Sequence, residues 1–477
     1  MSTLLAILLL TAPQPSLAFE ECRIGTREAG PRIPAGCVVL HLPENRATPS
    51  STREIPLHVA RLPARGGDSD LPPLLFIAGG PGQSALESFP AIAGAFEDVR
   101  RKRDIILMDQ RGTGRSNPLA CPQLEQTAEL PADFNPEHAR QAAANCAASL
   151  DADLRFYTTL DAVEDIEAVR VQLGHESLAV YGISYGTRVA QEYLRRYPDR
   201  VDAVILDGVT VPGEALGPEI ARDAQRALEL MFDRCAESKA CSERFPAIAQ
   251  RFEALQARLE SRAFEIGLRD PFSGERTAME ISWPRVAALL RMYSYAPETV
   301  SLLPLLLAQA EAGDWEAFGA NILILERESE TLLYTGMHNS VVCSEDAPLF
   351  PAGAVDEPAY LGTLTVDFIR AVCDAWPSRA MPPDFHRPVT SDVPVLLLSG
   401  EADPVTPPDN AKAVAKHFSN SRHLVAPGQG HGIAWRGCAP KLMATFLADR
   451  DPQGLDAACL EKLSGSAFFI DRNGPTP

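Results

Sequence analysis

The sequence contains no run of about 18 uninterrupted apolar residues, the length that a helix needs to cross a bilayer. It also lacks the HExxH, GxGxxG and P-loop patterns, and none of its cysteines stands in a CxxC pair. No internal repeat or low-complexity segment interrupts it. We therefore expect no stable membrane anchor beyond a leader, no metal site and no nucleotide or other organic cofactor.

Basic side chains are scarce, because 44 Lys and Arg stand against 63 Asp and Glu, for a formal net charge of -19. Nucleic-acid binding needs a clustered basic surface that neutralises phosphates, and anionic lipid makes the same demand. The charge balance therefore argues against both partners. It favours a well-solvated acidic surface that keeps the protein soluble.

The N-terminus predicts a secretory signal peptide over residues 1–18. An apolar run over 4–10 precedes a Pro-containing polar stretch and the small-residue end Ser16-Leu17-Ala18. Ten cysteines without metal-type spacing also favour export, where an even number forms disulfides. We expect a secreted or periplasmic protein after removal of the leader. Sequence proximity favours the disulfide pairs Cys22–Cys37, Cys121–Cys146, Cys235–Cys241, Cys343–Cys373 and Cys438–Cys459.

Short aliphatic runs followed by turns and helical patterns predict an α/β architecture with a mostly parallel sheet covered on both faces. Thr158, with Asp161 three positions on, predicts the start of a helix that ends at Gly174. The alternation of strands and helices breaks after residue 212, where apolar residues recur with helical spacing. The expected organisation is a signal peptide (1–18), the first part of the α/β core (19–212), a helical cap insertion (213–390) and the second part of the core (391–477). Strands are expected at 37–43, 55–62, 74–77, 105–109, 177–181, 202–206, 394–399 and 422–426.

The candidate nucleophile is Ser184, in the G-x-S-x-G pattern of residues 182–186. Such a serine stands on a strained turn between a strand and a helix, and small neighbours let the backbone pass close by. A strand pattern precedes this turn at 177–181, and a helical pattern follows it through Arg195. The context therefore predicts an exposed, reactive hydroxyl at position 184.

A serine hydroxyl needs a base, and the base needs an orienting carboxylate. In proteins with such a turn, called a nucleophile elbow, the serine comes first along the chain, then the acid and then the histidine. Asp403 follows the strand at 394–399, and His431 lies in the Gly-rich loop after the last strand. The separations, 403 − 184 = 219 and 431 − 403 = 28, leave room for the insertion and then for one helix and one strand.

Three rivals for these roles are placed less well. Glu401 comes two residues too early if the strand ends at Ser399, and Asp409 falls within the next expected helix. His423 lies inside a strand and is expected to be a packed side chain. For the oxyanion, the N–H of Tyr185 directly after the nucleophile is the expected first donor, and that of Gly80 the second.

Four kinds of segment in this chain form a recognisable set: 79–84 (GGPGQS), 109–116 (DQRGTGRS), 182–186 (GISYG) and the loops of Asp403 and His431. Together they resemble the prolyl aminopeptidase and tripeptidyl aminopeptidase family of serine peptidases, which have the α/β-hydrolase fold. The resemblance implies release of residues from free peptide N-termini beneath a helical cap, and it favours the exported tripeptidyl branch. That family often has His-Gly-Gly-Pro-Gly, whereas Ala78 stands here at the position of the histidine, as is common in the exported branch.

An N-terminal exopeptidase must bind a free ammonium, and Glu345 and Asp346 are candidate carboxylates because a disulfide through Cys343 would hold them rigidly. The alternative is a solvated acidic loop. The leading function is thus an exported serine exopeptidase that takes peptides with a free N-terminus. An esterase or lipase with the same triad, and a non-catalytic binding protein on this fold, are the alternatives.

Overall fold

The computed structural model describes residues 17–26, 30–50, 53–67, 69–121, 134–351 and 359–475, apart from the side chains of residues 328–332. Most of the expected signal peptide, residues 1–16, lies outside the described residues.

A nine-stranded sheet forms the centre of the molecule, in the order β1-β2-β3-β5-β4-β6-β7-β10-β11. The strands β1, β2, β3 and β5 pair antiparallel, and every further pair from β5 to β11 is parallel. The central strands β4, β5 and β10 are wholly buried, which explains their continuous apolar sequences. The strands are β1 (Glu20–Ile24), β2 (Ile33–Pro43), β3 (Glu54–Leu62), β4 (Leu74–Ile77), β5 (Ile105–Met108), β6 (Leu178–Ile183), β7 (Val201–Asp207), β10 (Val395–Gly400) and β11 (Ser421–Ala426).

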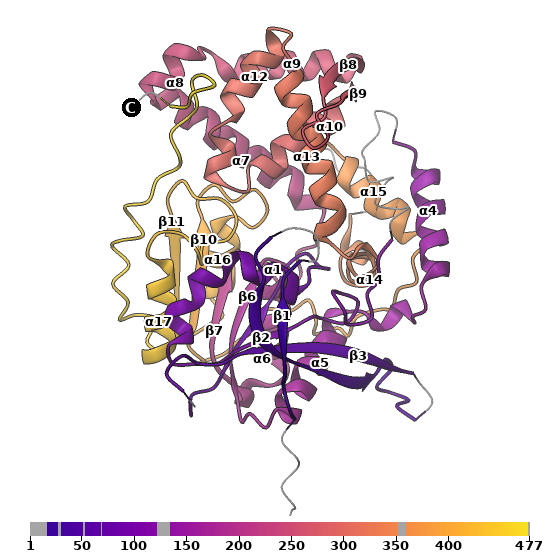
Figure 1. The fold of residues 1–477 in the computed structure, drawn as a ribbon, viewed down its shortest axis with the longest axis vertical. Helices are drawn as coiled ribbons and strands as arrows, with labels where there is room; N and C mark the ends of the chain where they lie inside the picture. Colours follow the sequence, from indigo (N-terminus) through magenta and orange to yellow (C-terminus); the bar gives the residue numbers. More distant parts are fainter. Residues whose placement is uncertain are drawn as a thin grey trace, which may run out of the picture.

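Helices cover both faces of this sheet, as expected for an α/β domain (Figure 1). One face packs its apolar side chains against α4 (Pro136–Ser149), α5 (Thr159–Gln172), α6 (Tyr185–Arg196) and α16 (Pro408–Ala415). The opposite face packs against α1 (Ala85–Ile92), α2 (Glu97–Arg100) and α17 (Ala439–Asp449). The helix expected from Thr158 is α5, whose first turn has the predicted capping box between Thr158 and Asp161.

The segment between β7 and β10, called here the insertion, contains most of the remaining helices. Its first part forms a separate hydrophobic cluster above the sheet (Figure 1). This part contains α7 (Pro218–Glu237), α8 (Lys239–Arg244), α9 (Ile248–Ser261), α10 (Trp283–Tyr293), α11 (Pro297–Val300), α12 (Leu303–Glu311), α13 (Glu316–Leu332) and a hairpin of β8 (Phe264–Arg269) and β9 (Arg276–Ile281).

Two features of the insertion differ from the sequence prediction. The β8–β9 hairpin was not expected, because its short strands stand among long helical patterns. The helices α14 (Thr335–Glu345) and α15 (Leu364–Cys373) place Met337, Val341 and Val372 in the hydrophobic cluster of the sheet, not in that of the insertion. These two helices therefore pack against the α/β core, whereas Tyr360 between them is buried in the insertion's cluster.

Five disulfides join the same cysteine pairs that sequence proximity favours. Cys343–Cys373 links α14 to α15, and Cys438–Cys459 fixes the start of the C-terminal segment. That segment runs from α17 up to the insertion, where Phe468 is buried among the insertion's apolar side chains (Figure 1). The N–H of Phe469 also donates to the carbonyl of Ser301, at 3.0 Å.

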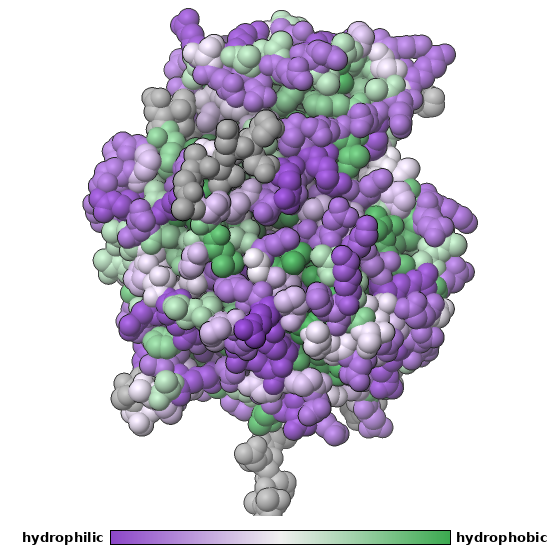
Figure 2. Space-filling model, turned by 180° about the vertical axis from the view of Figure 1, so that it is seen from behind, coloured by the Kyte–Doolittle hydropathy of each residue, from purple (hydrophilic) through white to green (hydrophobic). Residues whose placement is uncertain are grey.

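The surface is largely hydrophilic, with small dispersed apolar areas on the face drawn in Figure 2. In the described parts of the chain no helix has both the length and the apolar character required to span a bilayer. The same residues contain no cluster of three or more His, Cys, Asp or Glu side chains that could hold a metal ion.

Candidate active site

Ser184 stands alone on the turn between β6 and α6, with a backbone φ of 56° and ψ of -127°. This conformation is strained for a residue with a side chain. A Cβ at Gly182 would lie 2.3 Å from the carbonyl oxygen of Gly186, and one at Gly186 would lie 2.5 Å from that of Ile77. Only glycine fits at both positions, so the motif is required by the shape of the turn.

Asp403 and His431 come together above the C-terminal ends of the parallel strands. The Nδ1 atom of His431 lies 2.8 Å from Oδ2 of Asp403. The same carboxylate accepts hydrogen bonds from the amides of Val405 and Thr406, each at 2.9 Å, and from the Thr406 hydroxyl at 2.9 Å. Asp403 is fully buried, so its orientation toward the imidazole is fixed from several directions.

The two side chains shift each other's protonation. Burial acts to raise the pKa of Asp403, but the charge and hydrogen bond of His431, with two backbone amides, lower it below its usual value. Burial acts to lower the pKa of His431, but the charge and hydrogen bond of Asp403 raise it above its usual value. The pair therefore favours a charged carboxylate next to an imidazole of increased basicity, which suits a general base.

The His431 loop is held by two residues that sequence reasoning did not identify. Tyr295, after α10, accepts the backbone N–H of His431 through its carbonyl at 2.8 Å, and its ring packs edge-on against the imidazole at 5.3 Å. Asp207, at the end of β7, accepts the backbone amides of Ile433 and Ala434, each at 2.8 Å. An acid that ends a buried apolar strand was a usable signal for Asp207, whereas nothing in the sequence linked Tyr295 to His431.

A cavity of about 650 Å³ lies between the sheet edge and the insertion. Ser184 and His431 both line it, together with the two expected oxyanion donors, Gly80 and Tyr185. The insertion contributes the rest of the wall. Polar insertion residues on the wall include Glu214, Glu219, Asp223, Arg291, Tyr295, His338 and Asn339.

The loop of residues 79–82 lies directly against Ser184, because a Cβ at Gly79 would be 3.0 Å from that of Ser184. Gly80 has a φ of 107°, a conformation that favours glycine. Helix α14 holds this loop, since Tyr334 donates its N–H to the carbonyl of Gly82 at 2.9 Å. Tyr185 is the first residue of α6, where a backbone N–H has no acceptor within the helix. Both amides therefore suit the binding of an oxyanion.

Glu345 and Asp346 do not match the expectation that they bind a substrate ammonium. Both are 1% exposed, and neither is among the described residues that line the cavity. Arg188, one turn after the nucleophile, contacts Asp346 at 2.8 Å and Glu345 at 3.3 Å. Glu345 also accepts the N–H and hydroxyl of Thr159, at 2.6 and 2.8 Å. Because the two carboxylates are already paired, their geometry indicates that they attach α14 to α6 and α5.

The rivals for the triad have other contacts. Glu401 accepts the backbone N–H of Gly428 at 2.7 Å, and the side chain of Asp409 is 91% exposed on α16. His423 lies on β11, where its Nε2 atom is 3.0 Å from the Ser399 hydroxyl. None of the three lines the described part of the cavity wall.

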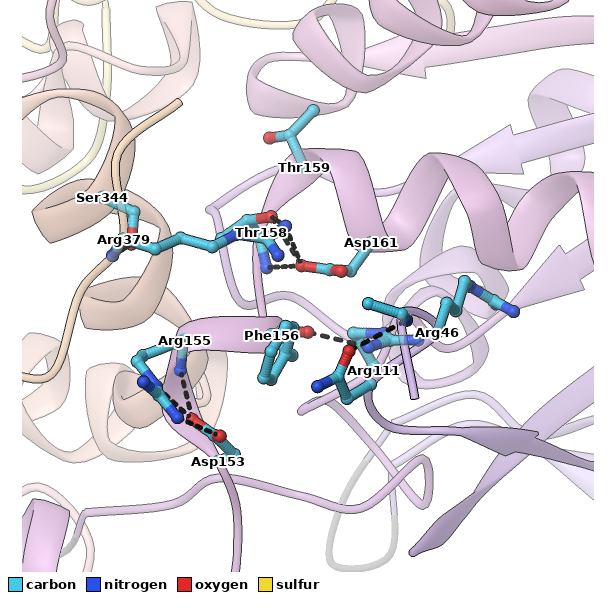
Figure 3. Close-up of polar contacts among 12 residues, drawn as sticks. Arg46, Arg111, Asp153, Arg155, Phe156, Thr158, Thr159, Asp161, Ser344 and Arg379 are labelled. Carbon is cyan, nitrogen blue, oxygen red and sulfur yellow. Dashed lines mark hydrogen bonds and ion pairs between the residues drawn. The ribbon is translucent and has the colours of Figure 1, made fainter. Parts of the chain in front are cut away.

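The motif at 109–116 supports the site from a distance. Arg111 is fully buried, forms a two-point ion pair with Asp165 at 2.7 Å, and donates to the carbonyl of Phe156 at 2.8 Å (Figure 3). Arg379, from the segment after α15, reaches Asp161 in the first turn of α5 at 2.7 Å (Figure 3). Asp109 accepts the hydroxyl of Ser84 at 2.6 Å, next to the oxyanion loop. The motif thus fixes loops around the site.

The fold and this arrangement of side chains define a hydrolase. The family model described as "alpha/beta hydrolase fold" matches residues 72–437, and the chain belongs to that family. It is 27% identical to YuaR of Escherichia coli K12 over 80% of this chain and 77% of that protein. It is 24% identical to a tripeptidyl aminopeptidase of Streptomyces coelicolor over 89% and 83%, and 34% identical to a proline iminopeptidase of Neisseria gonorrhoeae over 30% and 34%. The resemblance drawn from the motifs is thereby confirmed.

Proposed function

We propose that the protein is an exported serine exopeptidase that releases residues or short peptides from free peptide N-termini. The observation that carries this proposal is the hydrogen-bonded pair of Asp403 and His431, which shares one covered cavity with the strained Ser184. Relatives named tripeptidyl aminopeptidase and proline iminopeptidase support the choice of peptides as substrates. The five disulfides support a secreted or periplasmic location.

The proposed reaction has two steps. His431 takes the proton of the Ser184 hydroxyl as its oxygen attacks the scissile carbonyl, and Asp403 orients the imidazole and stabilises its charge. The amides of Gly80 and Tyr185 hold the negative oxygen of the tetrahedral intermediate. His431 then gives the proton to the leaving nitrogen, and an ester to Ser184 remains. Water, deprotonated by His431, hydrolyses this ester and restores the free serine.

A free N-terminus has a suitable counter-charge on the cavity wall. Glu214, Glu219 and Asp223 line the cavity at the start of the insertion, and Arg222 pairs with the latter two. Burial and the nearby Glu219 raise the pKa of Glu214, and burial raises that of Asp223 to about 6 although Arg222 opposes it. Arg226 also acts on Asp223, so three carboxylates stand against two cations and the region has one carboxylate in excess. An ammonium group at this place would relieve the crowding of negative charge.

The first experiment tests the nucleophile. We expect a fluorophosphonate probe to label the protein and the label to disappear in Ser184→Ala. Ser88→Ala is the matched control, because Ser88 also lines the cavity but is not on the elbow. Labelling that persists in Ser184→Ala would contradict the assignment.

A second experiment tests the substrate class. We expect cleavage of prolyl or tripeptidyl chromogenic amides with a free N-terminus, and a loss of at least tenfold in kcat/KM when the same amides are N-acetylated, because the ammonium can no longer pair with carboxylates. Turnover of simple esters without cleavage of any amide would replace the peptidase by an esterase. Equal rates for free and acetylated amides would remove the exopeptidase part of the proposal.

A further inference from the structure

Arg291, in the last turn of α10, is a cation on the cavity wall whose hydrogen-bonding capacity is mostly unused. Its Nη2 atom donates to the phenol oxygen of Tyr295 at 3.0 Å, its Nη1 atom lies 3.9 Å from the sulfur of Met292, and its guanidinium carbon lies 5.6 Å from the centre of the Tyr295 ring. None of the ion pairs between described residues includes it. Arg188, the other arginine on this wall, is by contrast held by two carboxylates. Partial burial of the charged guanidinium costs free energy, and a bound anion would offset this cost.

Arg291 and Tyr295 lie on the side of the imidazole. Tyr295, which accepts from Arg291, also contacts the backbone and the ring of His431. The charge of Arg291 is close enough to act against the raised pKa of His431. In the proposed reaction His431 transfers a proton to the leaving nitrogen, so groups beyond the imidazole meet the leaving part of the substrate.

We propose that Arg291, with the phenol of Tyr295, binds a carboxylate on the leaving part of a peptide substrate. This inference rests on the proposed function and deepens it. A guanidinium that lines the cavity without an ion pair to any described residue, next to a phenol on the same wall, matches the acceptor oxygens of a carboxylate. The carboxylate is either the C-terminus of a short substrate, one residue beyond the cleaved bond, or an acidic side chain at that residue. In the first case the enzyme is selective for short peptides.

Two substrate pairs separate these sources. The first pair compares Ala-Ala-Pro-Ala with its C-terminal amide. The second pair compares the C-terminal amides of Ala-Ala-Pro-Glu and Ala-Ala-Pro-Gln. The same two comparisons are made with dipeptides in which proline alone precedes the cleaved bond. We expect the wild type to favour the carboxylate member of at least one pair by about 10- to 100-fold in kcat/KM, as for a hydrogen bond to a charged group. Arg291→Gln should abolish this preference while it retains turnover of the neutral member. Arg291→Lys should retain part of the preference.

The control is Arg285→Gln on the same helix, because Arg285 pairs with Glu326 and does not line the described cavity wall. It should leave the preference unchanged. Fluorophosphonate labelling of Ser184 verifies that each variant is folded. If Arg291→Gln fails to label, Tyr295→Phe replaces it as the test, and we expect a reduced preference, because this change removes only the phenol oxygen next to Arg291. The inference is overturned, while peptidase activity stands, if neither wild-type pair shows a preference. It is likewise overturned if the preference persists in labelled Arg291→Gln, or in Tyr295→Phe where that variant replaces it. A labelled wild type that cleaves no peptide overturns the proposed function as well.

Discussion

Replacement of Asp403 by asparagine gives the sharpest test of the triad. The Asn side-chain oxygen can still accept from the amides of Val405 and Thr406, so the loop and the fold should persist. The Asn NH₂ group, however, points at Nδ1 of His431, from which the carboxylate accepts a hydrogen bond. This favours the tautomer with the proton on Nε2, which cannot take one from Ser184. We expect kcat to fall about 10⁴-fold, or about 5.5 kcal/mol in barrier height.

The pH profile of the same variant has a defined direction. The charge of Asp403 raises the pKa of His431 against the effect of burial, and catalysis needs the neutral imidazole. Without that charge the pKa falls, so the acid limb of kcat/KM should move to lower pH. Initial rates on a chromogenic substrate from pH 4 to 9 measure both effects. Asp409→Asn and Glu401→Gln are matched controls that should retain activity, and an Asp403→Asn enzyme within tenfold of wild type would refute the reasoning.

Gly208→Ala should lose most activity, because a Cβ at this position would lie 2.9 Å from Cε1 of His431. Gly174→Ala is the matched control, since Gly174 also has a positive φ but no atom lies within 4 Å of the added Cβ. It should remain active, at a similar cost in thermal stability. Burial raises the pKa of Glu345 to about 7, so its folded pKa exceeds its unfolded one and stability is lost as pH rises through about 4.5 to 7. The thermal midpoint of Glu345→Gln minus that of the wild type should therefore increase from pH 5 to pH 8. A difference that stays constant over this range would contradict the buried, proton-binding role of Glu345.

Much of the core could be predicted because its signals are local. Strands such as β4 and β10 are short apolar runs that end in glycine-rich turns, and the elbow of Ser184 needs small residues at fixed positions. The order of the candidate acid and base follows from the strand order. The strand β1 was missed because its residues Glu20–Ile24 are mostly exposed, and an edge strand of this kind has no apolar pattern.

The surroundings of the site could not be predicted, because they depend on partners far apart in the chain. Arg188 and Asp346 are 158 positions apart, and only their contact shows that the carboxylate is paired and does not face a ligand. In the sequence alone, Glu345 and Asp346 are only an acidic pair close to Cys343. Tyr295 reaches His431 from the insertion, 136 positions earlier (431 − 295 = 136), through a backbone carbonyl that has no signature in the residue type.

The C-terminal segment limits how the active site can admit substrate. Its near end is fixed to α17 by the Cys438–Cys459 disulfide, and its far end is buried in the insertion through Phe468 and paired through Arg472 with Asp314 at 3.0 Å. A hinge motion of the insertion away from the sheet would have to pull this segment out of its apolar contacts. Entry should therefore proceed by local movements of wall residues, while the insertion keeps its position over the cavity.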